Sequence, residues 1–246
     1  MEYEMNHKRR GSALIFNHEM FLTANERRGT NKDRDDLKER FQVLGFDVDE
    51  HNDKSKEEVL REIHKAAKAD HTDADCFVCI FLTHGEEGQI SAYDSMIKIK
   101  EITDPFRGDQ CKSLVGKPKI FIFQACAGKN YECGVTSMNA GDSEDEEELE
   151  EADHMYTIPA GADFIVCYSS AEGFRSFRHI KSGTFFIQDL CETLQNYGST
   201  LEFTELLTLV NLKVSRRCAS SEMSKKQMPC FTSMLTKKLY FRCNKQ

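Results

Sequence analysis

The sequence predicts an α/β protein in which a mostly parallel central sheet of about six strands carries helices on both faces. Short apolar runs rich in β-branched and aromatic residues alternate along the chain with segments of helical periodicity. This alternation is typical of parallel strands joined by helical crossovers. The runs are apolar throughout rather than at every second position, which indicates strands covered on both faces. The chain of 246 residues is long enough for one large domain of this kind.

Five apolar runs are expected to form buried strands in chain order. They lie at 13–16, at 46–48 (the start of a short strand), and at 76–82, 119–123 and 164–168. Residues 89–93 and 96–99 predict a small hairpin around Asp94 and Ser95, and two late strands are expected at 229–235 and 239–241.

Helical spacing of apolar residues predicts helices at 31–44, 55–67, 185–197 and 201–214. Asn31 is expected to cap the first helix. Ser55 and Glu58 have the spacing of a capping box at the start of the second. Gly198 is expected to end the third helix.

The net charge of −8 belongs to one segment. Residues 141–153 hold nine acidic side chains and no Lys or Arg, so the rest of the chain carries +1. Such a run cannot pack, because like charges repel and little apolar surface offsets the cost of ordering. We expect an exposed linker at 141–153 between a larger part, 12–140, and a smaller part, 154–246, after a short leader at 1–11. The last predicted parallel strand lies in the smaller part and needs neighbours, so the two parts should form one composite domain.

The near-neutral remainder excludes a basic nucleic-acid-binding surface. No apolar run approaches the 18–20 residues that span a bilayer, and the polar N-terminus does not resemble a secretory signal. We therefore expect no membrane or nucleic-acid partner and a cytoplasmic or nuclear location. The ten irregularly spaced cysteines fit free thiols in a reducing compartment.

Cys76 and Cys79 have a C-x-x-C spacing, which can indicate redox or metal chemistry. They lie in an extended run, where positions i and i+3 face opposite sides of a sheet. Two such thiols cannot easily share a ligand, so we favour core packing and expect no metal and no cofactor.

Unusual polar segments follow the predicted parallel strands, whose carboxyl ends share one edge of the sheet. His84 and Gly85 follow the third strand, and Gln124 and Cys126 follow the fourth. Arg27 comes after the first strand and Arg178 after the fifth. The edge should therefore gather a thiol, an imidazole, an amide and two guanidinium groups.

This set of groups has a coherent chemistry. A thiolate can attack a carbonyl carbon while His84 moves protons. The backbone amides of Gly85 and Cys126 can face the developing oxyanion. Arg27, Arg178 and Gln124 can bind a planar carboxylate. The predicted reaction is acyl transfer at a peptide bond next to an acidic side chain.

These segments resemble the blocks of the caspase family, in family order. The blocks are Arg-Arg-Gly-Thr at 27–30, Thr-His-Gly at 83–85, Gln-Ala-Cys-x-Gly at 124–128 and Cys-Tyr-Ser-Ser-Ala-Glu-Gly at 167–173, joined by 159–164 and 229–239. The resemblance covers roughly residues 11–241. It implies a caspase-like sandwich of the effector type that cleaves proteins after aspartate.

The resemblance implies a role for each site residue. Cys126 would be the nucleophile, His84 the proton carrier, and the amides of Gly85 and Cys126 the oxyanion hole. The substrate aspartate would be held by Arg27, Gln124 and Arg178, with Phe177 as an apolar neighbour in the binding site.

The resemblance also implies a zymogen. The acidic segment would be cut on activation, with Asp153 as the best site and Asp142 and Asp145 as alternatives. We expect no adaptor domain before Gly11, which would favour activation by another protease or by the chain itself. Protein substrates with exposed aspartates are the implied partners, together with a second copy of the chain paired through the strand near Cys230–Met234.

Two positions depart from the family pattern. Ala127 stands where Arg is usual, which removes up to five hydrogen-bond donors from beside the nucleophile. Arg175 stands where effector members tend to carry an aromatic side chain, so preference beyond the aspartate is left open. Ala127 motivates the alternative of a weakly active caspase-like regulator that acts by dimerising with an active relative.

Overall fold

Six strands form the central sheet of the computed structural model, which describes residues 1–86, 88–126, 128, 132–133, 159–218 and 225–242. Their spatial order is β13-β9-β7-β3-β1-β2. Five are parallel: β1 (Ser12–Asn17), β2 (Asp47–Asn52), β3 (Phe77–Leu82), β7 (Lys119–Gln124) and β9 (Phe164–Tyr168). β13 (Cys230–Ser233) runs antiparallel to β9 at one edge. The predicted fold class is confirmed.

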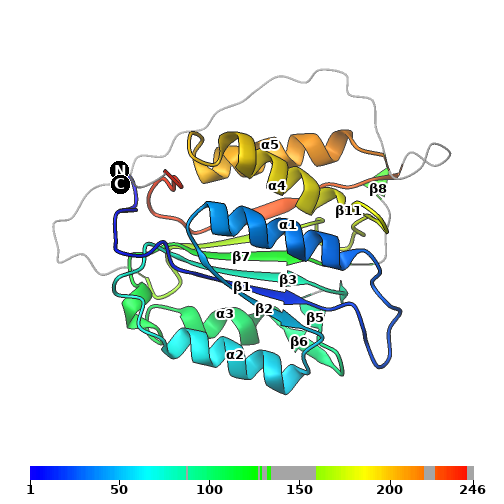
Figure 1. The fold of residues 1–246 in the computed structure, drawn as a ribbon, viewed down its shortest axis with the longest axis horizontal. Helices are drawn as coiled ribbons and strands as arrows, with labels where there is room; N and C mark the ends of the chain where they lie inside the picture. Colours follow the sequence, from blue (N-terminus) through cyan, green and yellow to red (C-terminus); the bar gives the residue numbers. More distant parts are fainter. Residues whose placement is uncertain (87, 127, 129–131, 134–158, 219–224, 243–246) are drawn as a thin grey trace.

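Helices cover both faces of this sheet (Figure 1). One face carries α1 (Thr30–Val43), α4 (Phe185–Tyr197) and α5 (Phe203–Arg216). The other carries α2 (Lys56–Lys68), α3 (Ile99–Thr103) and two short 3-10 helices, Asp104–Phe106 and Lys112–Leu114. Because both faces are covered, β3 and β7 are buried along their whole length.

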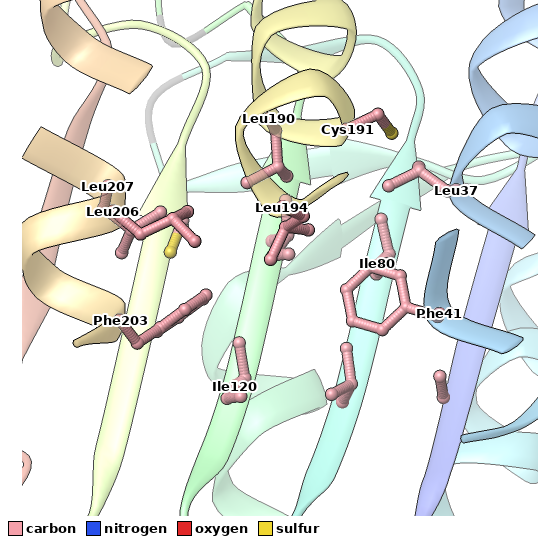
Figure 2. Packing of buried hydrophobic residues seen from close by; sticks show 14 of the residues in the cluster. Leu37, Phe41, Ile80, Ile120, Leu190, Cys191, Leu194, Phe203, Leu206 and Leu207 are labelled. Atoms are coloured by element: carbon pink, nitrogen blue, oxygen red, sulfur yellow. The ribbon is translucent and has the colours of Figure 1, made fainter. Parts of the chain in front are cut away.

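Two hydrophobic clusters fill the spaces between the sheet and its helices. On the α1, α4 and α5 side, Ile80 and Ile120 pack with helix residues such as Leu190 and Phe203 (Figure 2). The neighbouring strand residues point the other way, as Phe81 and Phe121 do toward α2 and α3. Alternation along a strand therefore divides one apolar run between two cores.

The same alternation separates the two cysteines of the C-x-x-C motif. Cys76 belongs to the cluster beneath α1 and α4, whereas Cys79 belongs to the cluster on the opposite face. Both are fully buried, and burial raises the pKa of each thiol. The interpretation as core residues is confirmed.

Smaller elements surround the carboxyl ends of the parallel strands. β4 (Gly85–Glu86), β5 (Gln89–Ser91) and β6 (Met96–Lys98) form a three-stranded sheet. β10 (Arg178–His179) and β11 (Gly183–Thr184) form a hairpin before α4. β8 (Glu132–Cys133) pairs with β12 (Lys225–Lys226). None of the described helices is long and apolar enough to cross a bilayer.

Helix starts agree with the sequence at α2 and differ at α1. Ser55 and Glu58 form the predicted capping box at the start of α2. The N-cap of α1 is Gly29 rather than Asn31 and makes no side-chain capping bond. A Cβ on Gly29 would lie 2.5 Å from the carbonyl oxygen of Ile180, so close backbone contact dictates the residue. Asn31 instead bonds Asn17 and donates to Glu19.

The predicted strand at 239–241 is wrong. Leu239 and Phe241 are buried in the core without a strand partner, and the ring of Phe241 lies 5.3 Å from that of Phe203 on α5. A run of three apolar residues can therefore be buried in the core without forming a strand. The expected linker at 141–153 lies outside the described residues.

Candidate active site

The ends of β3 and β7 bring His84 and Cys126 to neighbouring positions. The two strands are parallel, and Leu82 is the register partner of Gln124. His84 and Cys126 each follow these partners by two residues. The chains stay together beyond the strands: a Cβ on Gly85 would lie 2.9 Å from Ala125 Cβ and 3.0 Å from the Cys126 carbonyl oxygen. Gly85 is therefore required for this close approach.

The imidazole of His84 is held by the loop that follows β1. Its Nε2 lies 2.8 Å from the carbonyl oxygen of Asn25, and its ring centroid lies 4.8 Å from that of Phe21. A carbonyl only accepts, so Nε2 carries the proton and Nδ1 keeps a lone pair in the neutral ring. Burial, together with the charges of Arg27 and Arg178, lowers the pKa of His84. The neutral ring can therefore accept a proton at neutral pH.

The thiol of Cys126 is half-buried and faces Ser176. Its Sγ lies 3.9 Å from the Ser176 carbonyl oxygen and 3.8 Å from the Ser176 hydroxyl. Gln124 donates from Nε2 to the same hydroxyl at 3.1 Å, and its buried Oε1 has no hydrogen-bond partner among the described residues. Ser176 thus lies beside both Gln124 and the thiol, a position that the sequence analysis missed.

The Gln-Ala-Cys-x-Gly loop packs closely on the loop after β9. A Cβ on Gly128 would lie 2.2 Å from the backbone carbon of Gly173, which has a left-handed φ of 86°. The lack of a side chain at Gly128 and Gly173 therefore lets the segments at 124–128 and 167–173 pack against each other. Ala127 itself lies outside the described residues.

Arg27 and Arg178 bring two positive charges to the same region. The Arg27 side chain is buried, and its Nη1 donates to Thr30 Oγ1 at 2.7 Å and to the His18 carbonyl oxygen at 3.3 Å. Arg178 is half-buried and donates from Nε to the Arg28 carbonyl oxygen at 2.8 Å. Neither arginine is within ion-pair distance of any carboxylate in the described ranges.

The electrostatics of these guanidinium groups favour binding of an anion. Burial and the charge of Arg178 lower the pKa of Arg27 to about 9. Burial also lowers the pKa of Arg178. A desolvated cation without a counter-charge is costly, and an incoming carboxylate would offset that cost.

A chain of polar side chains supports Arg27 from the back. Thr30 Oγ1 accepts from Arg27 and donates to Asn17 Oδ1 at 2.7 Å. Asn17 then donates to Asn52 at 3.1 Å. Asn17 ends β1 and Asn52 ends β2, so the network fixes Arg27 to the sheet.

Phe177 precedes Arg178 in the chain, and both its backbone and its ring contact other parts of the fold. Its backbone N–H donates to Gln227 Oε1 at 2.7 Å, and Gln227 Nε2 donates to the Ser169 carbonyl oxygen at 2.6 Å. Its ring lies 6.3 Å from that of Phe185 at the start of α4. Phe177 is half-buried.

Cys126 lines a cavity of about 330 Å³. Its walls include Ala125, Cys126, Tyr168 and Cys230, and none of Arg27, Gln124 or Arg178 lines it. Cys126 therefore contributes to this cavity, whereas the two guanidinium groups lie outside its walls.

The structure brings together the predicted His84, Gly85, Gln124 and Cys126, with Arg27 and Arg178 linked to them through their loops. The predicted cleavage sites Asp142, Asp145 and Asp153 lie outside the described residues. Asn25 and Ser176 were not predicted. Asn25 takes part through its backbone carbonyl, which any residue type supplies, and Ser176 through its carbonyl and its hydroxyl. The only sequence signal for either residue is its place in a loop beside a predicted block.

A model of the family described as "Caspase domain" matches residues 10–240. The chain belongs to the caspase family. It is 54% identical to caspase-6 of Mus musculus, over 98% of this chain and 91% of the relative, and 42% identical to caspase-7 of Gallus gallus, over 98% and 80%. A crystal structure of caspase-1 from Spodoptera frugiperda superposes with a TM-score of 0.90 at 37% identity, covering 99% of this caspase and 96% of the other chain.

These likenesses confirm the family that the sequence blocks indicate. The segments at 159–164 and 229–239 resemble caspase six among the effector members, and the identities to caspase-6 agree with that resemblance. This caspase is an aspartate-specific cysteine endopeptidase, a hydrolase of apoptotic proteolysis.

Proposed function

We propose that Cys126 and His84 cleave peptide bonds after aspartate residues that Arg27, Gln124 and Arg178 hold in place. The observation that carries this proposal is the pair of guanidinium groups without ion-pair partners in the described chain, close to the thiol. Gln124 supports it, because its amide donates to the hydroxyl of Ser176, which also lies beside the thiol. A substrate carboxylate would complete this set of charges.

The proposed reaction runs in two steps. His84 takes the proton of the Cys126 thiol, the resulting thiolate attacks the backbone carbonyl carbon of the substrate aspartate, and the amides of Gly85 and Cys126 face the oxyanion. The C–N bond breaks as His84 gives a proton to the leaving amine, which leaves a thioester on Cys126. A water then loses a proton to His84 and attacks the thioester, releasing the new carboxylate and the thiol.

Hydrolysis of a peptide reporter with aspartate before the cleaved bond tests the nucleophile. We expect Cys126→Ala to lower turnover to below about one thousandth of wild type. Cys218→Ala, at an exposed cysteine after α5, is the matched control and should keep wild-type rates. Equal loss in both variants, or none in either, would contradict the role of Cys126.

The carboxylate site is tested with a second reporter in which asparagine replaces aspartate. Arg178→Ala should reduce kcat/KM for the aspartate reporter by a factor of about 30 to 1000, because a charge partner of the substrate is lost. The asparagine reporter should lose far less. Equal losses on both reporters would refute carboxylate recognition by Arg178.

We further propose that the chain is a zymogen activated by a cut in the acidic segment, by itself or by another protease. Asp153 is the favoured site, with Asp142 and Asp145 as alternatives. Mass analysis of the fragments from wild type and Asp153→Ala distinguishes them. Fragments that are unchanged in the variant would assign the cut to Asp142 or Asp145.

A homodimer through β13 is proposed from the position of that strand. β13 pairs with β9 on one side, and no described strand pairs with its other side. Exposed methionines, Met228 and Met234, flank it. An open edge of this kind can pair with a second copy. Thr232→Lys should give a monomer in analytical ultracentrifugation, and an unchanged dimer would place the interface elsewhere. The proposed setting is the cytoplasm or nucleus, where exposed aspartate sites of other proteins are the substrates.

Ala127 supports a second candidate function, a weakly active regulator that dimerises with an active relative. Its side chain cannot supply the donors that an arginine would place beside the nucleophile. Ala127→Arg in the cleaved enzyme separates the two functions. A large gain in turnover from a nearly inactive wild type would favour the regulator.

A further inference from the structure

Asp33 on α1 is fully buried and touches the hairpin that carries Arg178. Its Oδ1 accepts a hydrogen bond from the backbone N–H of Thr184 at 2.9 Å. The preceding residue, Gly183, lies so close that a Cβ there would be 2.2 Å from the same oxygen. Gly183 also has a left-handed φ of 86°, so the hairpin is shaped to receive this carboxylate.

The contact lies directly across the hairpin from Arg178. In the β10–β11 pairing, Thr184 is the register partner of Arg178. A side chain that fixes the backbone of Thr184 therefore fixes the strand position opposite Arg178. Thr184 also caps α4, since its hydroxyl accepts from the Ile187 N–H at 3.4 Å.

Two further contacts join the same pair of segments. Arg178 Nε donates to the Arg28 carbonyl oxygen at 2.8 Å, and Gly29 lies against the carbonyl oxygen of Ile180. Among these contacts Arg178 supplies a cationic donor and Asp33 supplies a carboxylate acceptor. The segment of Arg27 and the hairpin of Arg178 are therefore held together as one unit.

Burial of the Asp33 carboxylate is energetically unfavourable. Its Oδ2 has no hydrogen-bond partner in the described part of the chain, and burial raises the pKa of Asp33 to about 6. The charges of Arg27 and Arg178 act in the opposite direction without a direct ion pair, and Lys32 adds a weaker cationic influence from the same helix. A charged group kept without full compensation points to a task other than stability.

We propose that Asp33 is a positioning residue that holds Arg178 in place to bind the substrate aspartate, through its hydrogen bond to the Thr184 N–H. The inference rests on the proposed carboxylate site and adds to it the element that sets its geometry. Asp33 does not touch the substrate or the thiol. Its effect should therefore fall on substrate binding and leave the chemical step nearly unchanged.

Steady-state kinetics of Asp33→Ala, Asp33→Asn and Asp35→Ala on the aspartate reporter test the proposal, with alkylation of Cys126 to count active sites. For Asp33→Ala we expect KM to rise on the order of tenfold, with kcat per active site within about twofold of wild type. Asp33→Asn keeps an acceptor oxygen and should restore KM to within about threefold. Asp35 is exposed on the same helix and pairs with Arg34, so its alanine variant should match wild type.

Gly183→Ala breaks the same contact from the hairpin side and serves if Asp33→Ala does not fold. It should also raise KM while leaving kcat per active site nearly unchanged, because the new methyl group displaces the Asp33 carboxylate. Unchanged KM in both variants, or an Asp33→Asn variant as impaired as Asp33→Ala, would refute the role of Asp33. Wild type without turnover of the aspartate reporter would instead refute the proposed function, and this inference with it.

Discussion

His84 Nε2 lies 2.8 Å from the carbonyl oxygen of Asn25, so a loop that follows the first strand fixes a side chain that follows the third. The bond leaves Nδ1 as the atom able to exchange protons with a substrate or thiol. A backbone carbonyl therefore occupies the orienting position that a carboxylate fills in other nucleophile–histidine pairs. It orients the ring without adding a negative charge that would raise its pKa.

The pKa of His84 should lie below 6.5 and should depend on the ring of Phe21. Burial is the main cause of the lowered value. Phe21→Ala would admit water beside the imidazole, which favours the charged form and raises the pKa toward 6.5. NMR titration of the His84 ring in both proteins measures the change. Met20→Ala, at an exposed neighbour, is the control. A His84 pKa that is the same in Phe21→Ala and wild type would show that Phe21 does not shield the ring.

Thr30→Val should weaken the support of Arg27. The substitution keeps the shape but removes the hydroxyl that accepts from Arg27 and donates to Asn17. We expect a loss of about 1–3 kcal/mol in the free energy of unfolding and a several-fold rise in KM for the aspartate reporter. Thr208→Val removes an exposed hydroxyl on α5 and should change neither. Denaturant unfolding and kinetics check both effects, and a neutral result in Thr30→Val would show that the network is dispensable.

Ionised Asp33 should make the wild type less stable than Asp33→Asn at neutral pH. Burial raises the pKa of Asp33 in the folded state from 3.8 to about 6, even with Arg27 and Arg178 acting to lower it. The stability from the protonated carboxyl is present below pH 4 and is lost as the pH rises through 6. Integrated over this window, the loss is about 3 kcal/mol.

Urea unfolding of wild type and Asp33→Asn at pH 4.5 and 7.5 measures this effect. The difference in unfolding free energy should favour the asparagine variant more at pH 7.5 than at pH 4.5. Other acid-dependent groups are common to both proteins and cancel in the difference. A difference that does not change with pH would mean that Asp33 titrates as an ordinary carboxyl.

Ile122→Ala should be strongly destabilising. Ile122 is fully buried in β7 and belongs to the cluster beneath α4 and α5. Truncation leaves a cavity between sheet and helices, with an expected cost of about 2–5 kcal/mol. Val43→Ala, at an exposed position of α1, should cost less than about 0.5 kcal/mol. Thermal unfolding compares the two. A small effect of Ile122→Ala would mean that the surrounding helices collapse into the space.

The parts of the fold that could be predicted are those with a local signal. The all-apolar runs that become β3 and β7 have no other stable place than a sheet covered on both faces, and Ser55 with Glu58 marks the start of α2. The run at 239–241 lacks such a signal, since three apolar residues can equally well be buried in the core without pairing as a strand. Gly29 became a cap because of Ile180, which is distant in sequence.

The residues of the candidate site also divide into those that could be predicted from the sequence and those that could not. Cys126 and His84 could be placed because they follow two apolar runs that pair in register. Asn25 could not, because a backbone carbonyl carries no residue-type signature, and Ser176 could not, because its contacts with Gln124 and Cys126 join segments that are distant in sequence. In the sequence, Asp33 lies within the segment predicted to form the first helix. Its contact with Thr184 spans 151 residues of chain, and no local pattern reports such a pairing.

The neighbouring positions of β7 and β9 decide what a cut in the acidic segment would produce. β7 lies before that segment and β9 after it, yet the two form one ladder from Lys119 with Phe164 to Phe123 with Tyr168. The cluster beneath α4 and α5 likewise draws residues from both parts. After the cut, the two fragments would therefore stay associated, because each contributes strands and side chains to the core of the other. Neither fragment is a folding unit, so separating them would unfold both.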